Sequence, residues 1–186
     1  MYEKYESPLS SRYASDYMLH LFSQEKRIQT WRKLWVALAR AEHKLGLPIT
    51  AEQVAELEAH VNDIDFDCAA QREKEVRHDV MAHVYAYGKA APSAAGIIHL
   101  GATSCYVTDN GDLILYRDGL RYLRGELLGV LKNLAALVKV KTIVTLVVIA
   151  IFAVLSLRGD ITPDNVMIVV STVIAFYFGT QSEKKA

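Results

Sequence analysis

The charged residues of this chain are unevenly distributed, and this constrains the fold more than any other feature. Of 21 basic and 21 acidic side chains, only six lie in residues 142–186. Two uncharged stretches, residues 142–157 and 166–182, fill most of that segment. Segments this apolar are stable in a lipid bilayer or in a fully buried core. Residues 1–141 instead have the composition of a protein surrounded by water, so the chain divides into two parts of different character.

Composition excludes several classes of protein. A formal net charge of zero lacks the basic excess that binds nucleic acid, so we expect no nucleic-acid partner. The two cysteines, Cys68 and Cys105, form no CxxC pair, which argues against a disulfide scaffold and a cysteine zinc site. His78 and His83 are five residues apart rather than four, so we expect no metal. No cofactor is indicated. The polar N-terminus does not resemble a signal peptide, which predicts a cytoplasmic N-terminal domain.

Hydrophobic residues in the first part recur with the period of a helix, and no alternating run suggests a strand. Ser23 is a good N-cap, Gly46 a good C-terminal residue, and Thr50 with Gln53 fits a capping box. Pro92 ends a further helix. We therefore predict an all-α fold with five helices, near residues 24–46, 50–61, 66–76, 80–91 and 109–137. The first helix is expected to bury one stripe, formed by Ile28, Trp31, Leu34, Trp35, Leu38, Ala41 and Leu45.

Two segments do not fit a plain helical bundle. Residues 77–79 place an arginine, a histidine and an aspartate at a helix start. Residues 97–110 place small residues and hydroxyls just before Asp109, which is expected to open the last of these helices. Backbone N–H groups and hydroxyls at such a position suit a carboxylate or a phosphate. The alternatives are a capped surface turn for residues 77–79 and a loop with local side-chain hydrogen bonds for residues 97–110.

Four segments resemble the adenylosuccinate lyase family of the fumarase/aspartase superfamily. They are SPLSSRYAS, TWRKLWVALARAEHKLGLPIT, RHDVMAHV and AAGIIHLGATSCYVTDN, in that order. The resemblance extends from about Tyr5 to about Ala136. Thr108 departs from it, because the family usually has glycine at this position.

The resemblance implies a carbon–nitrogen lyase of purine nucleotide biosynthesis. The family eliminates fumarate from adenylosuccinate to give AMP, and from the related succinyl-carboxamide ribotide. A base removes a proton next to a carboxylate, and an acid protonates the leaving nitrogen. By resemblance, Arg12 and Tyr13 contact the nucleotide phosphate, and Thr103 and Ser104 donate to a carboxylate of the fumarate portion. The remaining substrate contacts are Arg77, His78 and Asp79, with His78 also assisting catalysis.

The resemblance also predicts that this chain is incomplete as an enzyme. In the family, a second catalytic histidine, a flexible loop with the catalytic serine and a long tetramer-forming bundle follow this region. None of these segments is found in the chain. We therefore expect a truncated lyase that is inactive alone and binds an adenylosuccinate-type nucleotide weakly if it binds at all.

The apolar tail is expected to form a two-helix transmembrane hairpin, which contacts lipid through residues 142–182. Lys139 and Lys141 precede it and Lys184 and Lys185 follow it, whereas the loop between the two helices carries one cation and two acids. The positive-inside rule then predicts that both ends face the cytoplasm. The tail also weakly resembles small two-helix phage membrane proteins of the holin type. The alternative is a buried hairpin in a soluble bundle. The predicted domains are therefore residues 1–138, lyase-like, and residues 139–186, membrane hairpin.

The last lyase-like helix is expected to lack a partner for its leucines, so we also expect self-association of the soluble part. The exposed side chains would be Leu120, Leu123, Leu127, Leu131 and Leu134. Two other functions stay open. The chain could be a small phage-type membrane protein with a passenger lyase fragment, or a module that senses purine nucleotides at the membrane.

Overall fold

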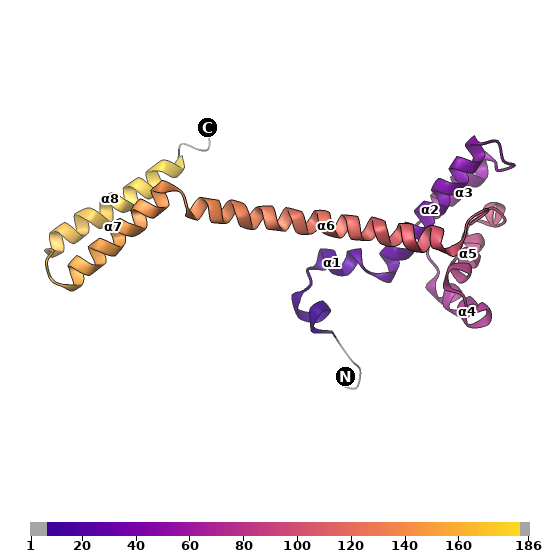
Figure 1. Ribbon diagram of the computed structural model, residues 1–186, viewed down its shortest axis with the longest axis horizontal. Helices are drawn as coiled ribbons and strands as arrows, with labels where there is room; N and C mark the ends of the chain where they lie inside the picture. The colour runs from indigo at the N-terminus through magenta and orange to yellow at the C-terminus, as the bar shows by residue number, and fades with distance from the viewer. Residues whose placement is uncertain (1–6, 183–186) are drawn as a thin grey trace. The chain divides into compact units, whose positions relative to one another are not determined.

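The computed structural model describes residues 7–182, and their side chains except those of residues 140, 141, 163 and 176–182. Every regular element in this range is a helix, which confirms the predicted all-α class (Figure 1). The chain divides into two compact units between Leu123 and Arg124. The predicted domain boundary near Val138 stays a prediction. The elements are η1 (Leu9–Tyr13), α1 (Asp16–Leu21), α2 (Gln24–Lys44), α3 (Ala51–Ala59), α4 (Phe66–Val76), α5 (Asp79–Ala90), η2 (Pro92–Ala94), α6 (Ser104–Leu137), α7 (Val140–Leu157) and α8 (Pro163–Ser182).

Local capping residues set the helix limits of the first unit. The Ser23 hydroxyl accepts a hydrogen bond from the Lys26 amide and starts α2, and Gly46 follows its end with a φ of +84°. Thr50 and Gln53 form the predicted capping box of α3. Each cap satisfies an amide or carbonyl that the helix leaves unpaired. These predictions are confirmed.

The core of the first unit lies between α2, α3, α5 and the start of α6. Trp31 and Trp35 of α2 are almost fully buried, and they pack beside Leu57, Tyr87 and Val107. The Trp35 ring lies against Tyr87, with centroids 6.1 Å apart. Large aromatic side chains contribute most to burial in so small a core.

The single buried stripe predicted for α2 is wrong in part. Ala41 and Leu45 are exposed, whereas Arg32 and Glu42 are buried. The reason is that several elements pack around α2: α3 contacts it, and Gly111 of α6 lies against Trp31. A helix packed on several sides buries more than one stripe, and a buried polar group is costly unless it finds a partner. Arg32 finds partners through its Nη1, whereas the Glu42 Oε2 has none among the described residues.

Arg32 joins three elements inside the core. Its Nη1 donates to the carbonyl oxygens of His60, at 2.6 Å, and Asp63, at 2.8 Å, in the loop after α3. Its guanidinium carbon lies 4.2 Å from the ring centroid of Tyr87 on α5. Burial lowers the pKa of Arg32, but a guanidinium stays protonated in proteins. Arg32 therefore connects the α3–α4 loop and α5 to α2.

The helix expected to open at Asp109 begins five residues earlier, at Ser104. Tertiary contacts explain the difference. Val107 is fully buried, and the Tyr106 hydroxyl donates to the Leu34 carbonyl of α2 at 3.0 Å. These contacts stabilise a helical turn whose serine, cysteine and threonine have low helix propensity.

The second unit contains the end of α6, followed by α7 and α8. These last two helices run in opposite directions on either side of the turn after Leu157 (Figure 1). No single described helix is long and apolar enough to cross a membrane, although α6 and residues 142–157 together, as a bent pair, meet that criterion by length and composition alone. The transmembrane assignment is therefore not established. Lys184 and Lys185, which entered the topology prediction, lie outside the described residues.

The buried guanidinium of Arg32 gives a direct test of this core. We expect Arg32→Met to lower the free energy of unfolding by roughly 2–4 kcal/mol, because two buried carbonyl groups lose a charged donor. Arg40 is a matched control, since it pairs with Glu58 at the surface, where such pairs contribute less than about 1 kcal/mol. Denaturant unfolding of the full chain in detergent, followed by tryptophan fluorescence, measures both variants. Equal losses of unfolding free energy for Arg32→Met and Arg40→Met would contradict the role of Arg32 in stabilising the core.

Candidate functional site

The first candidate segment forms a two-residue connection between α4 and α5. Arg77 ends α4 in the left-handed conformation, with a φ of 53°, and its N–H donates to the Glu73 carbonyl. His78 then becomes the N-cap of α5: its Nδ1 accepts a hydrogen bond from the Met81 amide at 3.4 Å. Asp79 is the first helical residue. The segment therefore caps α5, as expected for a capped turn, and it also places the Asp79 Oδ1 3.7 Å from the His78 Nδ1.

The second candidate segment meets the first at the start of α6. The Ser104 Oγ lies 3.3 Å from the His78 Nε2, across 26 residues of sequence. Because the Nδ1 of neutral His78 accepts from a backbone amide, its Nε2 carries the proton and donates to the Ser104 hydroxyl. Thr103 precedes Ser104 and is exposed. The N-termini of α5 and α6 therefore lie together, and unpaired amides at such ends favour anions.

His99 adds a third polar group, which the sequence analysis did not single out. Its Nδ1 accepts a hydrogen bond from the Trp35 indole N–H at 3.0 Å, which leaves the proton on Nε2. Burial, and then the charge of nearby His78, lower the pKa of His99. Its φ of 67° is unusual for a residue with a side chain. A histidine four residues before Thr103 was the sequence signal that could have indicated it.

Arg12 and Tyr13 belong to η1, a short π-helix, and both side chains are exposed. Within residues 7–182, no hydrogen bond or ion pair joins either of them to His78 or Ser104. The structure therefore brings His78 and Ser104 together, with Asp79 beside His78. The Arg77 side chain instead lines a separate surface hollow with Glu73 and Lys74.

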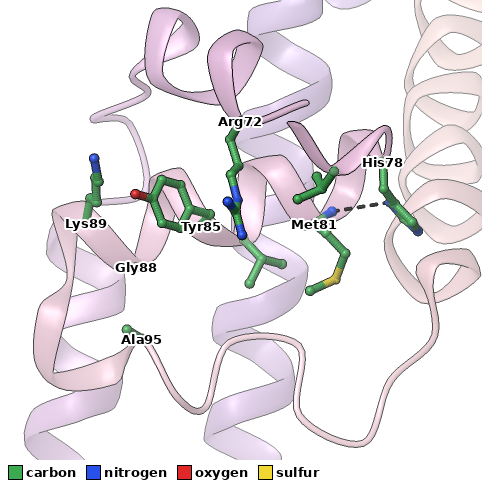
Figure 2. Close-up of a pocket in the computed structure, with 9 residues that line it drawn as sticks. Arg72, His78, Met81, Tyr85, Gly88, Lys89 and Ala95 are labelled. Carbon is green, nitrogen blue, oxygen red and sulfur yellow. Dashed lines mark hydrogen bonds between the residues drawn. The ribbon is translucent and has the colours of Figure 1, made fainter. Parts of the chain in front are cut away.

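An open cleft of about 610 Å³ lies beside His78, between α4, α5 and the residue after η2 (Figure 2). The Tyr85 ring lies between Arg72 and Lys89: their cationic groups are 4.8 and 4.9 Å from its centroid. Hydrogen bonding to the Tyr85 side chain raises the pKa of Lys89. The lining of the cleft is mostly apolar, with cations at the edge. It consists of Arg72, Val76, His78, Met81, Val84, Tyr85, Gly88, Lys89 and Ala95. Among the described residues, no cluster of metal-ligating side chains occurs.

His83, one turn after Asp79, lies in the core behind this site. Its ring contacts those of Trp31 and Phe66, with centroids about 6 Å apart. Burial lowers its pKa most, and the Arg32 charge lowers it further, whereas Asp79 raises it. His83 is therefore stable as the neutral imidazole, and protonation opposes folding.

Comparison with known proteins identifies close relatives of one region of the chain. It is 56% identical over 137 residues to adenylosuccinate lyase of Schizosaccharomyces pombe, which covers 72% of this chain and 28% of that protein. The enzyme of Saccharomyces cerevisiae is 51% identical over the same length, also covering 72% of this chain and 28% of the relative. The enzyme of Pyrococcus abyssi is 31% identical over 132 residues, or 69% of this chain and 29% of the relative. No protein-family model matches the chain. The chain spans less than a third of these relatives' lengths.

The neutral state of His83 predicts a pH dependence. A histidine in an unfolded chain has a pKa of about 6.5, and the folded value is lower. The stability due to neutral His83 is therefore complete above the unfolded pKa and is lost as the pH falls through the folded pKa. We expect His83→Leu to reduce the loss of unfolding free energy between about pH 7 and about pH 5.

Tryptophan fluorescence during denaturant unfolding measures this pH dependence, since Trp31 contacts the His83 ring. His20→Gln, a change at an exposed histidine of α1, serves as the control and is expected to leave the slope unchanged. The same slope in wild type and His83→Leu would be inconsistent with a buried neutral His83.

Proposed function

We propose that this chain, which contains a fragment of the adenylosuccinate lyase family, carries part of a substrate-binding site for an adenylosuccinate-type nucleotide and does not complete the lyase reaction alone. The observation that supports this most is the contact between His78 and Ser104 at the N-termini of α5 and α6. Adenylosuccinate carries a phosphate and two carboxylates. Two helix N-termini, an arginine and hydroxyl donors suit such anions.

Each residue of the cluster has a chemical role in this proposal. Ser104 and Thr103 donate hydrogen bonds to a carboxylate of the fumarate portion. The guanidinium of Arg77 offsets the charge that spreads into that carboxylate when the neighbouring carbon loses its proton. Neutral His78 lies beside the leaving nitrogen and assists its departure by donating a hydrogen bond from Nε2. To transfer a proton it must first become the imidazolium, whose Nδ1–H gives up the Met81 amide and faces the Asp79 Oδ1, 3.7 Å away. Arg12 and Tyr13 contact the phosphate, which requires η1 to approach the cluster in the complex.

The proposed inactivity follows from the catalytic groups that the elimination reaction requires. Elimination requires both a base and an acid, and His78 supplies at most one of them. No histidine follows His99 in the sequence, and residues 142–182 are almost entirely apolar. The family's second catalytic histidine and its serine loop therefore have no counterpart in the 186-residue chain.

The first functional test measures fumarate formation from adenylosuccinate by the purified full chain. We expect no measurable activity, because a missing acid or base each costs about 10²–10⁴-fold in rate. Fumarate release near the rate of a complete lyase would overturn the proposal of inactivity.

The same preparation tests binding separately by titration calorimetry with adenylosuccinate. We expect Ser104→Ala to weaken binding about tenfold, because it removes one hydrogen bond to a charged group. Ser171→Ala, at an exposed position of α8, is the control and is expected to have no effect. Equal affinities for both variants would contradict the role of Ser104 without bearing on activity.

We also propose that α7 and α8 insert into a lipid bilayer as a hairpin, with both ends on the cytoplasmic side. At 18 and 20 residues, these helices extend about 27 and 30 Å, close to the thickness of a hydrocarbon core. Their outward positions carry large exposed apolar side chains, including Ile149, Val154 and Ile168. The Thr172 hydroxyl donates to the Ile168 carbonyl. This hydrogen bond satisfies the hydroxyl without water. This surface also favours the alternative function, a small phage-type membrane protein with a passenger lyase fragment.

Carbonate extraction of membranes tests the hairpin. We expect the full chain to stay in the membrane pellet, since each outward apolar residue favours lipid over water. A variant with Val147→Asp and Ile168→Asp is expected to shift toward the soluble fraction, and Asp160→Asn, in the turn, is the control. Full release of the unchanged chain would exclude insertion.

A further inference from the structure

Glu42 of α2 is a buried acid that the proposed binding site does not use. Its side chain is 9% exposed, and its Oε2 has no hydrogen-bond partner among the described residues. Its Oε1 lies 3.5 Å from the position that a Cβ atom on Gly101 would take. Burial raises the pKa of the Glu42 carboxyl group. An ionised carboxylate without partners is costly to bury, and the neutral form costs much less.

The Glu42 carboxyl group lies against the loop of residues 99–103, which we call the 99–103 loop. His99 and Gly101 have positive φ angles of 67° and 65°. The amides of Leu100 and Ala102 donate to backbone carbonyls, each at 3.3 Å, which is longer than a typical backbone hydrogen bond. Three residues of the loop are exposed. Such a loop opens more readily than a helix, so a group packed against it affects its stability.

We propose that Glu42 is a positioning residue for the 99–103 loop. The loop packs closed against the neutral carboxyl group, and it opens when the group ionises and releases its proton to water. Closing removes water from the carboxyl oxygens, and an ionised oxygen needs either water or a hydrogen-bond donor. Within the described residues, the closed loop supplies no donor to Oε2. Opening lets water reach this atom.

The direction of the pH dependence follows from the raised pKa of Glu42. Because this pKa is higher in the closed loop than in the open one, the closed state binds more protons between the two values. The closed state is therefore most stable below the ordinary glutamate pKa of about 4.3, and this stability is lost as the pH rises through the raised pKa. One titrating proton limits the change in the opening constant to about tenfold per pH unit.

Other titratable groups around Glu42 act differently. Burial, and then the charge of Glu42, raise the pKa of Tyr106 on α6, so this phenol stays neutral. Burial lowers the pKa of His99 in the loop, and protonation of His99 would break the hydrogen bond that its Nδ1 accepts from Trp35. That change opens the loop as the pH falls, which is opposite in sign to the effect of Glu42. On α2 itself, the His43 Nδ1 donates to a backbone carbonyl at 2.6 Å and keeps this bond in either protonation state.

The 99–103 loop leads directly into the proposed binding site, so its effect on binding rests on the proposed function. Thr103 belongs to the loop, and Ser104 follows it with its Oγ 3.3 Å from the His78 Nε2. Opening of the loop frees Thr103 and leaves the backbone of Ser104 supported from the α6 side alone. Ionisation of Glu42 therefore lowers the affinity of these donors for an anion.

Hydrogen exchange of the full chain in detergent tests the pH dependence without a nucleotide. Mass spectrometry follows the peptide of residues 97–106 between about pH 4.5 and about pH 7.5, with rates corrected for the direct effect of pH on amide exchange. We expect its protection to fall as the pH rises, by at most about tenfold per pH unit. In Glu42→Gln, which has an uncharged side chain of the same shape, we expect no such fall. Glu25→Gln, at an exposed glutamate of the same helix, is the control and is expected to follow the wild type.

Two results would overturn the role of Glu42 in closing the loop. One is protection of the wild-type peptide that stays constant or increases as the pH rises. The other is the same loss of protection in Glu42→Gln as in the wild type. Circular dichroism shows whether Glu42→Gln keeps its helix content, and if it does not, the wild-type profile decides alone.

Titration calorimetry with adenylosuccinate then tests the effect on the binding site. At about pH 7.5 we expect Glu42→Gln to bind roughly threefold or more tightly than the wild type, and at about pH 5 we expect equal affinities. Equal affinities at both pH values would overturn the positioning role, even where the loop protection differs. No binding by either chain would overturn the proposed function instead, and hydrogen exchange would still decide whether Glu42 controls the loop.

Discussion

The buried guanidinium of Arg32 is the contact on which the first unit depends most. It donates to two carbonyl groups of the loop after α3 and lies over the Tyr87 ring. Tyr87 in turn donates its hydroxyl to the Leu57 carbonyl of α3. A charge removed from water is costly unless its donors find partners. The two carbonyl groups and the Tyr87 ring compensate part of this cost, although the Nε and Nη2 of Arg32 have no hydrogen-bond partner among the described residues. These contacts hold the loop and α5 against α2.

The candidate site follows from the position of α5. Because α5 is fixed by its buried residues, its N-cap His78 has a defined place, and Val107 fixes the start of α6 in the same way. The contact between His78 and Ser104 is thus made by the ends of two helices whose other residues are in the core. Arg12 and Tyr13 lack this support, since η1 contains no buried residue.

Local signals in the sequence predicted most helices of the first unit but not the whole arrangement. Ser23, Thr50 and Pro92 act through neighbouring atoms, so their effects can be read from a short segment. The early start of α6 and the burial of Arg32 depend on residues distant in sequence, which no local pattern reveals. For the site, residue types indicated the two segments at 77–79 and 103–104, whereas the role of Trp35 in orienting His99 required the fold. The leucines expected to be exposed are exposed, from Leu120 to Leu134.

The helix α6 is supported unevenly, and this has a consequence for function. Its first four turns are fixed by Tyr106, Val107 and Gly111 in the core. Tyr122 still stacks on Tyr17 of α1, with ring centroids 4.4 Å apart. From Leu123 to Leu137 the leucine and valine side chains of α6 are exposed. The geometry of Ser104 therefore does not depend on what covers the exposed leucines from Leu127 to Leu137. Contacts made by these leucines would change the stability of the chain, while the residues of the candidate site keep the same local arrangement, so the two properties can vary independently.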